Sequence, residues 1–235
     1  MNRAHLLGIL LFCLSFAGHA ATMPPVRMKV VDAQDGSPVA GALVIFYAKA
    51  REGTWTGHGG KHATLWVAEA ATDGAGEVRF PEQAFSRQPF FLNTNYESPT
   101  MVILKPGYVL LPLIHSVRPN ADLDELTAWP YQDQAVKLKR GATEADTAMS
   151  ANLAASYANH PMSSTNLCAW KSVPRFLVAA DRLAAEWNRM RKATTDPAYR
   201  HQVVMSPLER ITGNEKVFVE KGCGSPKAFF EPYLR

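Results

Sequence analysis

The chain has 235 residues, and 47% of them are hydrophobic, which is enough to build a sizeable apolar core. Its formal net charge is only +4, from 25 Lys and Arg against 21 Asp and Glu. Nucleic-acid-binding domains usually carry a denser basic patch, so we expect no nucleic-acid partner. The charge is uneven, because residues 21–139 carry a net charge of −1 and residues 140–235 a net charge of +4.

Residues 1–20 have the pattern of a secretory signal peptide. Arg3 precedes an apolar run at residues 6–16, and Gly18 and Ala20 are small residues at the expected cleavage site. The run is too short to span a bilayer as a mature helix, and no later stretch is long and apolar enough for a membrane anchor. The sequence therefore predicts a periplasmic or secreted protein whose mature chain has no transmembrane anchor.

Cys168 and Cys223 are the cysteines that remain after residue 20. A single pair of cysteines in an exported protein favours a disulfide bond. A metal site or a nucleophile is the alternative, but the chain has no C-x-x-C spacing and no histidine beside either cysteine. We predict that this disulfide closes part of the C-terminal region.

Short segments rich in β-branched and aromatic residues alternate with Gly, Pro and Asp through the first part of the chain. This spacing predicts a β-sandwich of about seven antiparallel strands. The segments are VRMKVVD (26–32), ALVIFYAKA (42–50), TLWVAEAA (64–71), GEVRFP (76–81), TMVILK (100–105), YVLLPLI (108–114) and AVKLKR (135–140).

Three turns between these segments carry recognisable motifs. Residues 32–42 read D-x-x-D-G-x-P-V-x-G-A, residues 72–76 read T-D-G-A-G, and residues 105–108 read K-P-G-Y. Gly36, Gly74 and Gly76 are expected to adopt positive φ in these turns. In this order the motifs resemble the carboxypeptidase regulatory-like family, a transthyretin-like β-sandwich, over residues 26–139.

The resemblance implies an accessory, non-catalytic domain. The catalytic zinc of the peptidases after which the family is named belongs to a separate domain, and no matching H-x-x-E motif occurs here. Transthyretin-like hydrolases end in Tyr-Arg-Gly-Ser, whereas this chain ends in Pro-Tyr-Leu-Arg at residues 232–235. We therefore expect no enzymatic activity and no cofactor, and we assign no catalytic residue.

The segment GTWTGHGGKHATLW at residues 53–66 contains the strongest candidates for local chemistry. His58 and His62 are four residues apart, which on a helix would place both rings toward one metal ion. The intervening glycines oppose a helix, and Glu69 is the first residue that could complete a ligand set. The favoured interpretation is a long hairpin loop in which Trp55, His58 and His62 contact a ligand, and a metal or hydrolytic site is the alternative.

Residues 140–235 are expected to be helical. Thr143 and Asp146 form a capping pair for one helix, and Pro174 opens a second helix with a clear apolar stripe. The stripe, expected to pack on the sandwich or a neighbouring helix, comprises Phe176, Leu177, Ala180, Leu183, Ala184, Trp187 and Met190. The candidate binding row on another face comprises Arg175, Arg182 and Arg189, with Glu186 spaced to pair with the latter two.

An acidic cluster at Asp122, Asp124 and Glu125 could hold calcium, but it lacks the ligand spacing and glycine of an EF-hand, so a solvated turn is favoured. The sequence as a whole predicts an exported, non-catalytic binding or scaffold protein of the bacterial cell envelope. Its partner would be a protein, a glycan or another envelope component. The alternative is a metal-binding or hydrolytic protein that uses the loop of His58 and His62.

Overall fold

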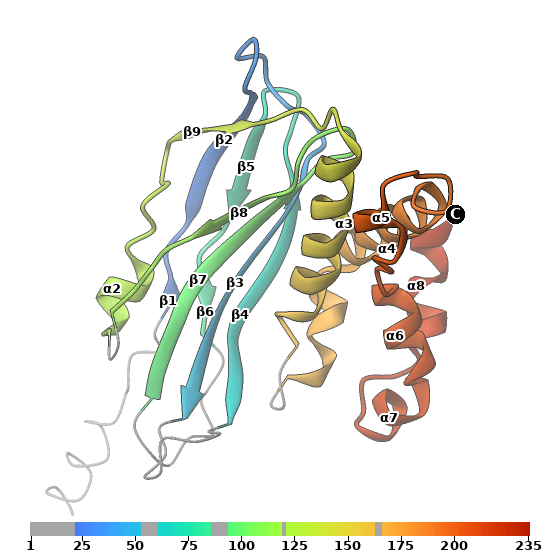
Figure 1. Cartoon of the computed structure of the whole chain (residues 1–235). Coiled ribbons are helices and arrows are strands. Elements are labelled where there is room, and N and C mark those ends of the chain that lie inside the picture. The colour runs from blue at the N-terminus through green and yellow to red at the C-terminus, as the bar shows by residue number, and fades with distance from the viewer. Residues whose placement is uncertain (1–21, 53–60, 86–93, 119–120, 163–165) are drawn as a thin grey trace, which may run out of the picture.

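The structure is a computed structural model that describes residues 22–52, 61–85, 94–118, 121–162 and 166–235. Its first part is built from β-sheets and its C-terminal part from helices (Figure 1). This order confirms the predicted β-rich region followed by a helical region. The predicted signal peptide at residues 1–20 lies outside the described residues and stays a prediction.

A four-stranded antiparallel sheet forms the centre of the molecule. Its strands run in the order β4 (His62–Ala71), β3 (Leu43–Glu52), β7 (Thr94–Leu104) and β8 (Leu111–Ile114). The central strand β3 is apolar along most of its length because both of its faces are covered. A register shift after Ala48 marks a bulge in the pairing of β3 with β4.

A three-stranded sheet lies on one side of the four-stranded sheet, with the order β5 (Glu77–Phe80), β2 (Val26–Asp32) and β9 (Ala135–Leu138). Strand β2 pairs antiparallel with β5 and parallel with β9. The prediction of an entirely antiparallel arrangement was therefore wrong for this pair. A third, two-stranded sheet joins β1 (Thr22–Met23) and β6 (Gln83–Ala84).

The turn motifs produce the expected backbone at two of three glycines. Gly36 and Gly76 have φ values of +72° and +74°, but Gly74 does not adopt positive φ. Gly76 has a second constraint, because an added Cβ would come within 2.5 Å of the carbonyl oxygen of Val30. A glycine is required there by both conformation and close packing.

One apolar core fills the space between the four-stranded and three-stranded sheets. Strand β2 contributes to this core through every second residue, since Val26, Met28 and Val30 are buried while the residues between them are exposed. Phe46 lies at its centre, with ring centroids 4.6 Å from those of both Trp66 and Trp129.

The helices cover the opposite face of the four-stranded sheet, so this sheet lies between the small sheet and the helical layer (Figure 1). The helical elements are α2 (Leu123–Thr127), α3 (Glu144–Asn159), η2 (Leu167–Ser172), α4 (Pro174–Met190), α5 (Pro197–Arg200), α6 (Pro207–Gly213), α7 (Glu215–Glu220) and α8 (Pro226–Leu234). Short α2 belongs to the connection before β9 rather than to this layer. None of the helices in the described ranges is long and apolar enough to cross a bilayer.

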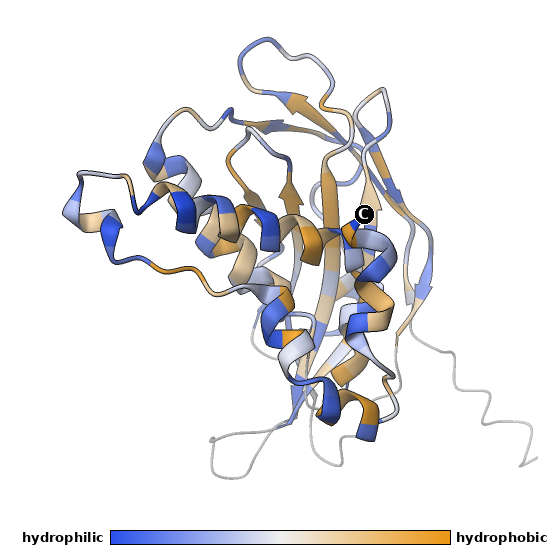
Figure 2. Cartoon of the chain, turned by 90° about the vertical axis from the view of Figure 1, so that its right-hand side faces the viewer, coloured by the Kyte–Doolittle hydropathy of each residue, from blue (hydrophilic) through white to orange (hydrophobic). Residues whose placement is uncertain are grey.

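A second core lies between the sheet and the helices. The predicted apolar stripe of α4 supplies much of it, with Phe176, Leu177 and Ala180 fully buried. The outward side of the helical layer carries both hydrophilic and hydrophobic residues (Figure 2). Trp170 is also fully buried, and nearby Cys168 forms the predicted disulfide with Cys223. The two Cα atoms are 5.3 Å apart, within the ordinary range for a disulfide.

Candidate functional site

The side chain of Asp32, at the end of β2, is fully buried and joins three separate segments. Its carboxylate accepts hydrogen bonds from the Gln34 N–H at 2.7 Å, the Tyr108 hydroxyl at 2.8 Å and the Arg140 Nε at 2.5 Å. These contacts, led by the backbone N–H of Gln34, lower the pKa of Asp32 to about 2. The motif that begins at Asp32 therefore fixes the turn of residues 105–108 in place.

A pocket of about 350 Å³ lies between this turn and the helical layer. The turn forms one wall, and residues near the start of α3 and on α4 form the others. The lining residues are Leu104, Lys105, Pro106, Gly107, Tyr108, Gly141, Asp146, Thr147, Ser150, Ala179, Arg182, Leu183 and Glu186. The volume lies in the range of small-molecule sites.

Two cations line this pocket. Lys105 comes from the turn and Arg182 from α4, and within the described part of the chain neither side chain forms a hydrogen bond or an ion pair. Glu186, one helical turn after Arg182, also has no such contact among the described residues. The three unpaired charges give the pocket an excess of one positive charge, so it favours a ligand that carries an anionic group.

The other acidic side chain in the pocket, Asp146, already has its partners. It accepts hydrogen bonds from the backbone N–H groups of Ala142 and Thr143 at 3.1 and 3.2 Å and pairs with Lys139 at 3.2 Å. These contacts, with the N–H of Ala142 first, lower the pKa of Asp146 to about 2. Thr143 and Asp146 form the capping box that the sequence predicts, and Asp146 acts as a structural group at the start of α3.

The three arginines of the predicted row have different surroundings. Arg175 pairs with Glu69 of β4, whose side chain is only 4% exposed, at an Nε–Oε1 distance of 2.7 Å. Glu69 also accepts a hydrogen bond of 2.5 Å from the N–H of Phe176 and so caps the start of α4. Arg175 therefore attaches α4 to the sheet, and its predicted binding role stays a prediction.

Arg182 lines the pocket, and Arg189 is exposed beyond it. Among the residues that the structure describes, Glu186 does not form the expected ion pair with either of them. The row thus contributes one residue, Arg182, to the candidate site. Arg189 has the same charge on the same helix and serves as its natural control.

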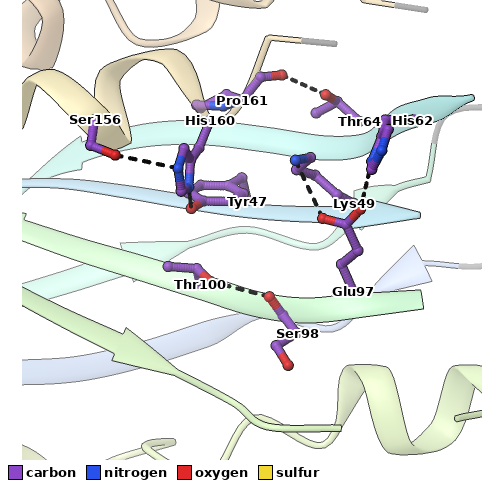
Figure 3. A network of polar contacts seen from close by, with 10 residues as sticks. All are labelled: Tyr47, Lys49, His62, Thr64, Glu97, Ser98, Thr100, Ser156, His160 and Pro161. Carbon is purple, nitrogen blue, oxygen red and sulfur yellow. Dashed lines mark hydrogen bonds and ion pairs between the residues drawn. The ribbon is translucent and has the colours of Figure 1, made fainter. Parts of the chain in front are cut away.

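His62 belongs to a different polar cluster, which joins β4, β3 and β7 of the four-stranded sheet (Figure 3). Its Nδ1 lies 2.8 Å from Oε1 of Glu97, and Oε2 of Glu97 pairs with Lys49 at 3.3 Å. No three His, Cys, Asp or Glu side chains in the described ranges are grouped so that they could hold a metal ion. Trp55 and His58 lie outside the described residues, so their predicted roles stay predictions.

The same cluster contains a contact between sheet and helix that the sequence analysis missed. The hydroxyl of Tyr47 on β3 lies 3.0 Å from Nδ1 of His160, at the end of α3, and Ser156 Oγ lies 3.5 Å from His160 Nε2 (Figure 3). Burial raises the pKa of Tyr47 and lowers that of His160. No sequence signal links Tyr47 with His160, which follows it by 113 positions.

The acidic cluster considered for calcium is used within the fold. Asp122 accepts a hydrogen bond of 2.9 Å from the N–H of Glu125 and caps α2. Glu125 pairs with Arg118 at 2.7 Å. The favoured turn is thus a short capped helix, and two of the three acidic residues are already occupied by internal partners.

Comparisons with known proteins leave the family of this chain open. No family model matches the chain, and no curated protein matches it. Among solved structures, a streptococcal ancillary pilin aligns with a TM-score of 0.28 and 13% identity over 51% of this chain and 30% of the pilin. A 3-chlorocatechol 1,2-dioxygenase from Rhodococcus opacus 1CP aligns with a TM-score of 0.30 and 17% identity over 53% of this chain and 61% of the dioxygenase. The chain thus spans less than two thirds of either protein.

Proposed function

We propose that this is an exported, non-catalytic binding protein of the cell envelope, and that its ligand site is the pocket between the turn of residues 105–108 and α4. The observation that carries the proposal is the pair of cations, Lys105 and Arg182, which line one concave site and have no partner among the residues that the structure describes. Guanidinium and ammonium groups bind carboxylates and phosphates strongly. We infer that the ligand presents such an anionic group.

The walls of the pocket are held by contacts outside it, which supports a binding role. The buried Asp32 fixes the turn through Tyr108, and the buried Glu69 anchors the start of α4. A site whose walls are already in place loses less conformational entropy when a ligand binds. Apolar side chains, Leu104 and Leu183 among them, supply contact area beside the two cations.

We also infer that residues 26–139 form a transthyretin-like β-sandwich of the carboxypeptidase regulatory-like type. The support is the series of turn motifs at residues 32–42, 72–76 and 105–108. An experimental structure whose strand connections differ from those of that family would contradict this assignment. Export is tested separately, since the mass of the secreted protein should correspond to a chain that begins near Ala21.

A thermal-shift panel tests the proposed ligand class. Inorganic phosphate, succinate and a dipeptide serve as probes for phosphate, dicarboxylate and zwitterionic ligands. A probe at 100 times its dissociation constant should raise the melting temperature by about 5 °C or more. Arg182→Gln should remove most of that rise, whereas Arg189→Gln should keep it.

The same variants give the result that would contradict the proposal. A probe that stabilises the parent, Arg182→Gln and Arg189→Gln proteins equally would place its site elsewhere. Stoichiometric zinc, copper or iron that is lost in the His58→Ala variant would instead favour the metal-binding alternative.

A further inference from the structure

An extended segment at residues 202–206 connects α5 to α6, and the proposed ligand pocket does not use it. We call it the connecting segment. It forms an apolar stretch of chain on the outside of the helical layer (Figure 2). Burial alternates along it, as in an extended chain, since Val204 is 3% exposed while Val203 is 60% and Met205 72% exposed. Those two are the most exposed large hydrophobic side chains in the described part of the protein.

One edge of the connecting segment is already bonded within the protein. The side-chain amide of Asn188 on α4 donates to the carbonyl of Val204 at 2.7 Å, and the side-chain oxygen of Asn188 accepts from the Val204 N–H at 3.1 Å. The hydroxyl of Ser206 donates to Asp181 on the same helix. Helix α4 therefore holds the segment in place along this edge.

The opposite edge is open. In an extended chain the N–H and C=O groups of successive residues point to opposite sides, so those of Val203 and Met205 point away from Asn188. Within the described ranges, the Met205 N–H donates no hydrogen bond and the Val203 C=O accepts none. An exposed edge with unpaired backbone groups and apolar side chains is a template for pairing with another chain.

A groove of about 850 Å³ lies beside the connecting segment on the same surface. Its apolar lining includes Leu208 of α6 and Phe230 and Leu234 of α8, with Met205 at its edge. This surface thus carries both an exposed apolar side chain and an apolar hollow. A surface that contains both parts of a contact can bind a second copy of itself around a twofold axis.

The charges around the groove also favour a second copy over a strongly charged partner. The groove is lined by Asp181 and Glu209 and by Arg210 and Lys227, so its charges balance. Glu209 and Arg210 form no ion pair with any residue that the structure describes. A second copy would offer an arginine to each free glutamate and a glutamate to each free arginine.

We propose that the connecting segment is the contact of a twofold dimer, in which the segments of two copies pair antiparallel about Val204. The Met205 N–H of each copy donates to the Val203 C=O of the other, while Asn188 keeps its bonds to Val204. Each Met205 side chain then lies beside Val203 of the other copy. The contact uses residues of α4 other than those of the proposed ligand pocket, so it does not depend on that pocket.

Sedimentation velocity over a series of protein concentrations tests this proposal. The mean mass should rise with concentration from that of one chain toward that of two. Met205→Glu removes the central apolar side chain and places two like charges near the twofold axis, so it should raise the dissociation constant of the dimer about tenfold or more. Glu209→Arg should also weaken the dimer, and Glu209→Arg/Arg210→Glu should restore it.

Hydrogen exchange of the Met205 amide tests the strand pairing itself. Because this N–H has no acceptor among the described residues of its own chain, it should exchange rapidly in the monomer and more slowly as the dimer forms. In the Met205→Glu protein the amide at this position should exchange rapidly at every concentration.

Val217→Glu is the matched control. Val217 is exposed on α7, which lies beyond α6 from the connecting segment, so the same new charge there should leave the dimer unchanged (Figure 1). Circular dichroism checks that each variant is folded. Arg182→Gln should dimerise as the parent does, so failure of the proposed ligand pocket leaves this test unaffected.

Three outcomes would overturn the proposal. The first is a protein that stays monomeric at every concentration, and the second is an equal weakening of the dimer by Met205→Glu and Val217→Glu. The third is a Met205 amide that is protected only when an apolar peptide of another sequence is added, which would assign the connecting segment to a different partner.

Discussion

The hydroxyl of Tyr108 donates a hydrogen bond of 2.8 Å to the fully buried carboxylate of Asp32. This contact links the end of β2 to the turn after β7, across 76 positions of the chain. The turn motif that begins at Asp32 has no reactive group in the candidate site, but through this hydrogen bond it affects the shape of the site. The motif holds the wall that carries Lys105.

Asp32→Asn should destabilise the protein and flatten its response to acid. The folded-state pKa of Asp32 is about 2, below the ordinary aspartate value, so its contribution to stability is complete above about pH 4 and is lost as the pH falls toward 2. The substitution should lower the melting temperature at pH 7 by about 5 °C. It should also reduce the loss of stability between pH 4 and pH 2, as measured by urea unfolding.

Asp146 should also make the folded protein less stable in acid, because its folded-state pKa is likewise about 2. The Asp32→Asn protein should thus keep part of the acid response. An unfolding free energy that is identical to that of the parent at every pH from 7 to 2 would contradict the role assigned to Asp32.

Glu69→Ala should release the start of α4 from the sheet. It removes an acceptor for the N–H of Phe176 and leaves Arg175 without its partner. Loss of a cap with a charge-assisted hydrogen bond costs about 2 kcal/mol, which corresponds to a fall in melting temperature of about 5 °C. Calorimetry measures the fall in melting temperature. Glu186→Ala, on α4 itself, is the control and should change the free energy of unfolding by less than about 0.5 kcal/mol.

Reduction of the disulfide should destabilise the helical layer. Cys168 and Cys223 are 55 positions apart, and closing a loop of that length contributes about 4 kcal/mol in the chain-entropy account. A reductant should lower the melting temperature by about 10 °C. The Cys168→Ser protein should have this lower melting temperature from the outset, and a reductant should not change it. A parent protein with the same melting temperature before and after reduction would show that the bond does not stabilise the fold.

The ring of His160 should titrate below the ordinary histidine range. It lies against Tyr47 and Tyr157, with centroid distances of 6.2 and 5.0 Å, and burial lowers its pKa. Groups near it include Lys49, which lowers the pKa further, and Glu97, which raises it.

Because the folded pKa of His160 is lowered, the protein should lose stability as the pH falls below about 6.5. Nuclear magnetic resonance of the histidine Cε1 protons measures the pKa, with His160→Ala to assign the signal. A value at or above 6.5 would be the contrary result.

Local patterns predict local structure in this chain. The alternation in β2, the capping box of Thr143 and Asp146 and the proline at the start of α4 each depend on residues close together in sequence, and the structure confirms them. The disulfide was also predictable, because only one pairing of Cys168 and Cys223 exists.

Long-range partners were not predictable in this way. The parallel pairing of β2 with β9 depends on the path of the chain between them, which a strand pattern does not encode. Glu69 caps a helix that begins 105 positions later, so Arg175 was indistinguishable from Arg182 in sequence. Lys105 occurs in a predicted turn motif, but its place in a pocket beside Arg182 becomes visible only when the helices are placed against that turn.

The most direct test of the account is a double-mutant cycle on the anion that binds most tightly, measured by isothermal titration calorimetry. Lys105→Gln and Arg182→Gln should each weaken binding by about tenfold or more. If both cations contact one anion, the double variant should differ from the sum of the single effects by at least about 0.5 kcal/mol. A Lys105→Gln/Arg182→Gln protein that binds as tightly as the parent would contradict the account.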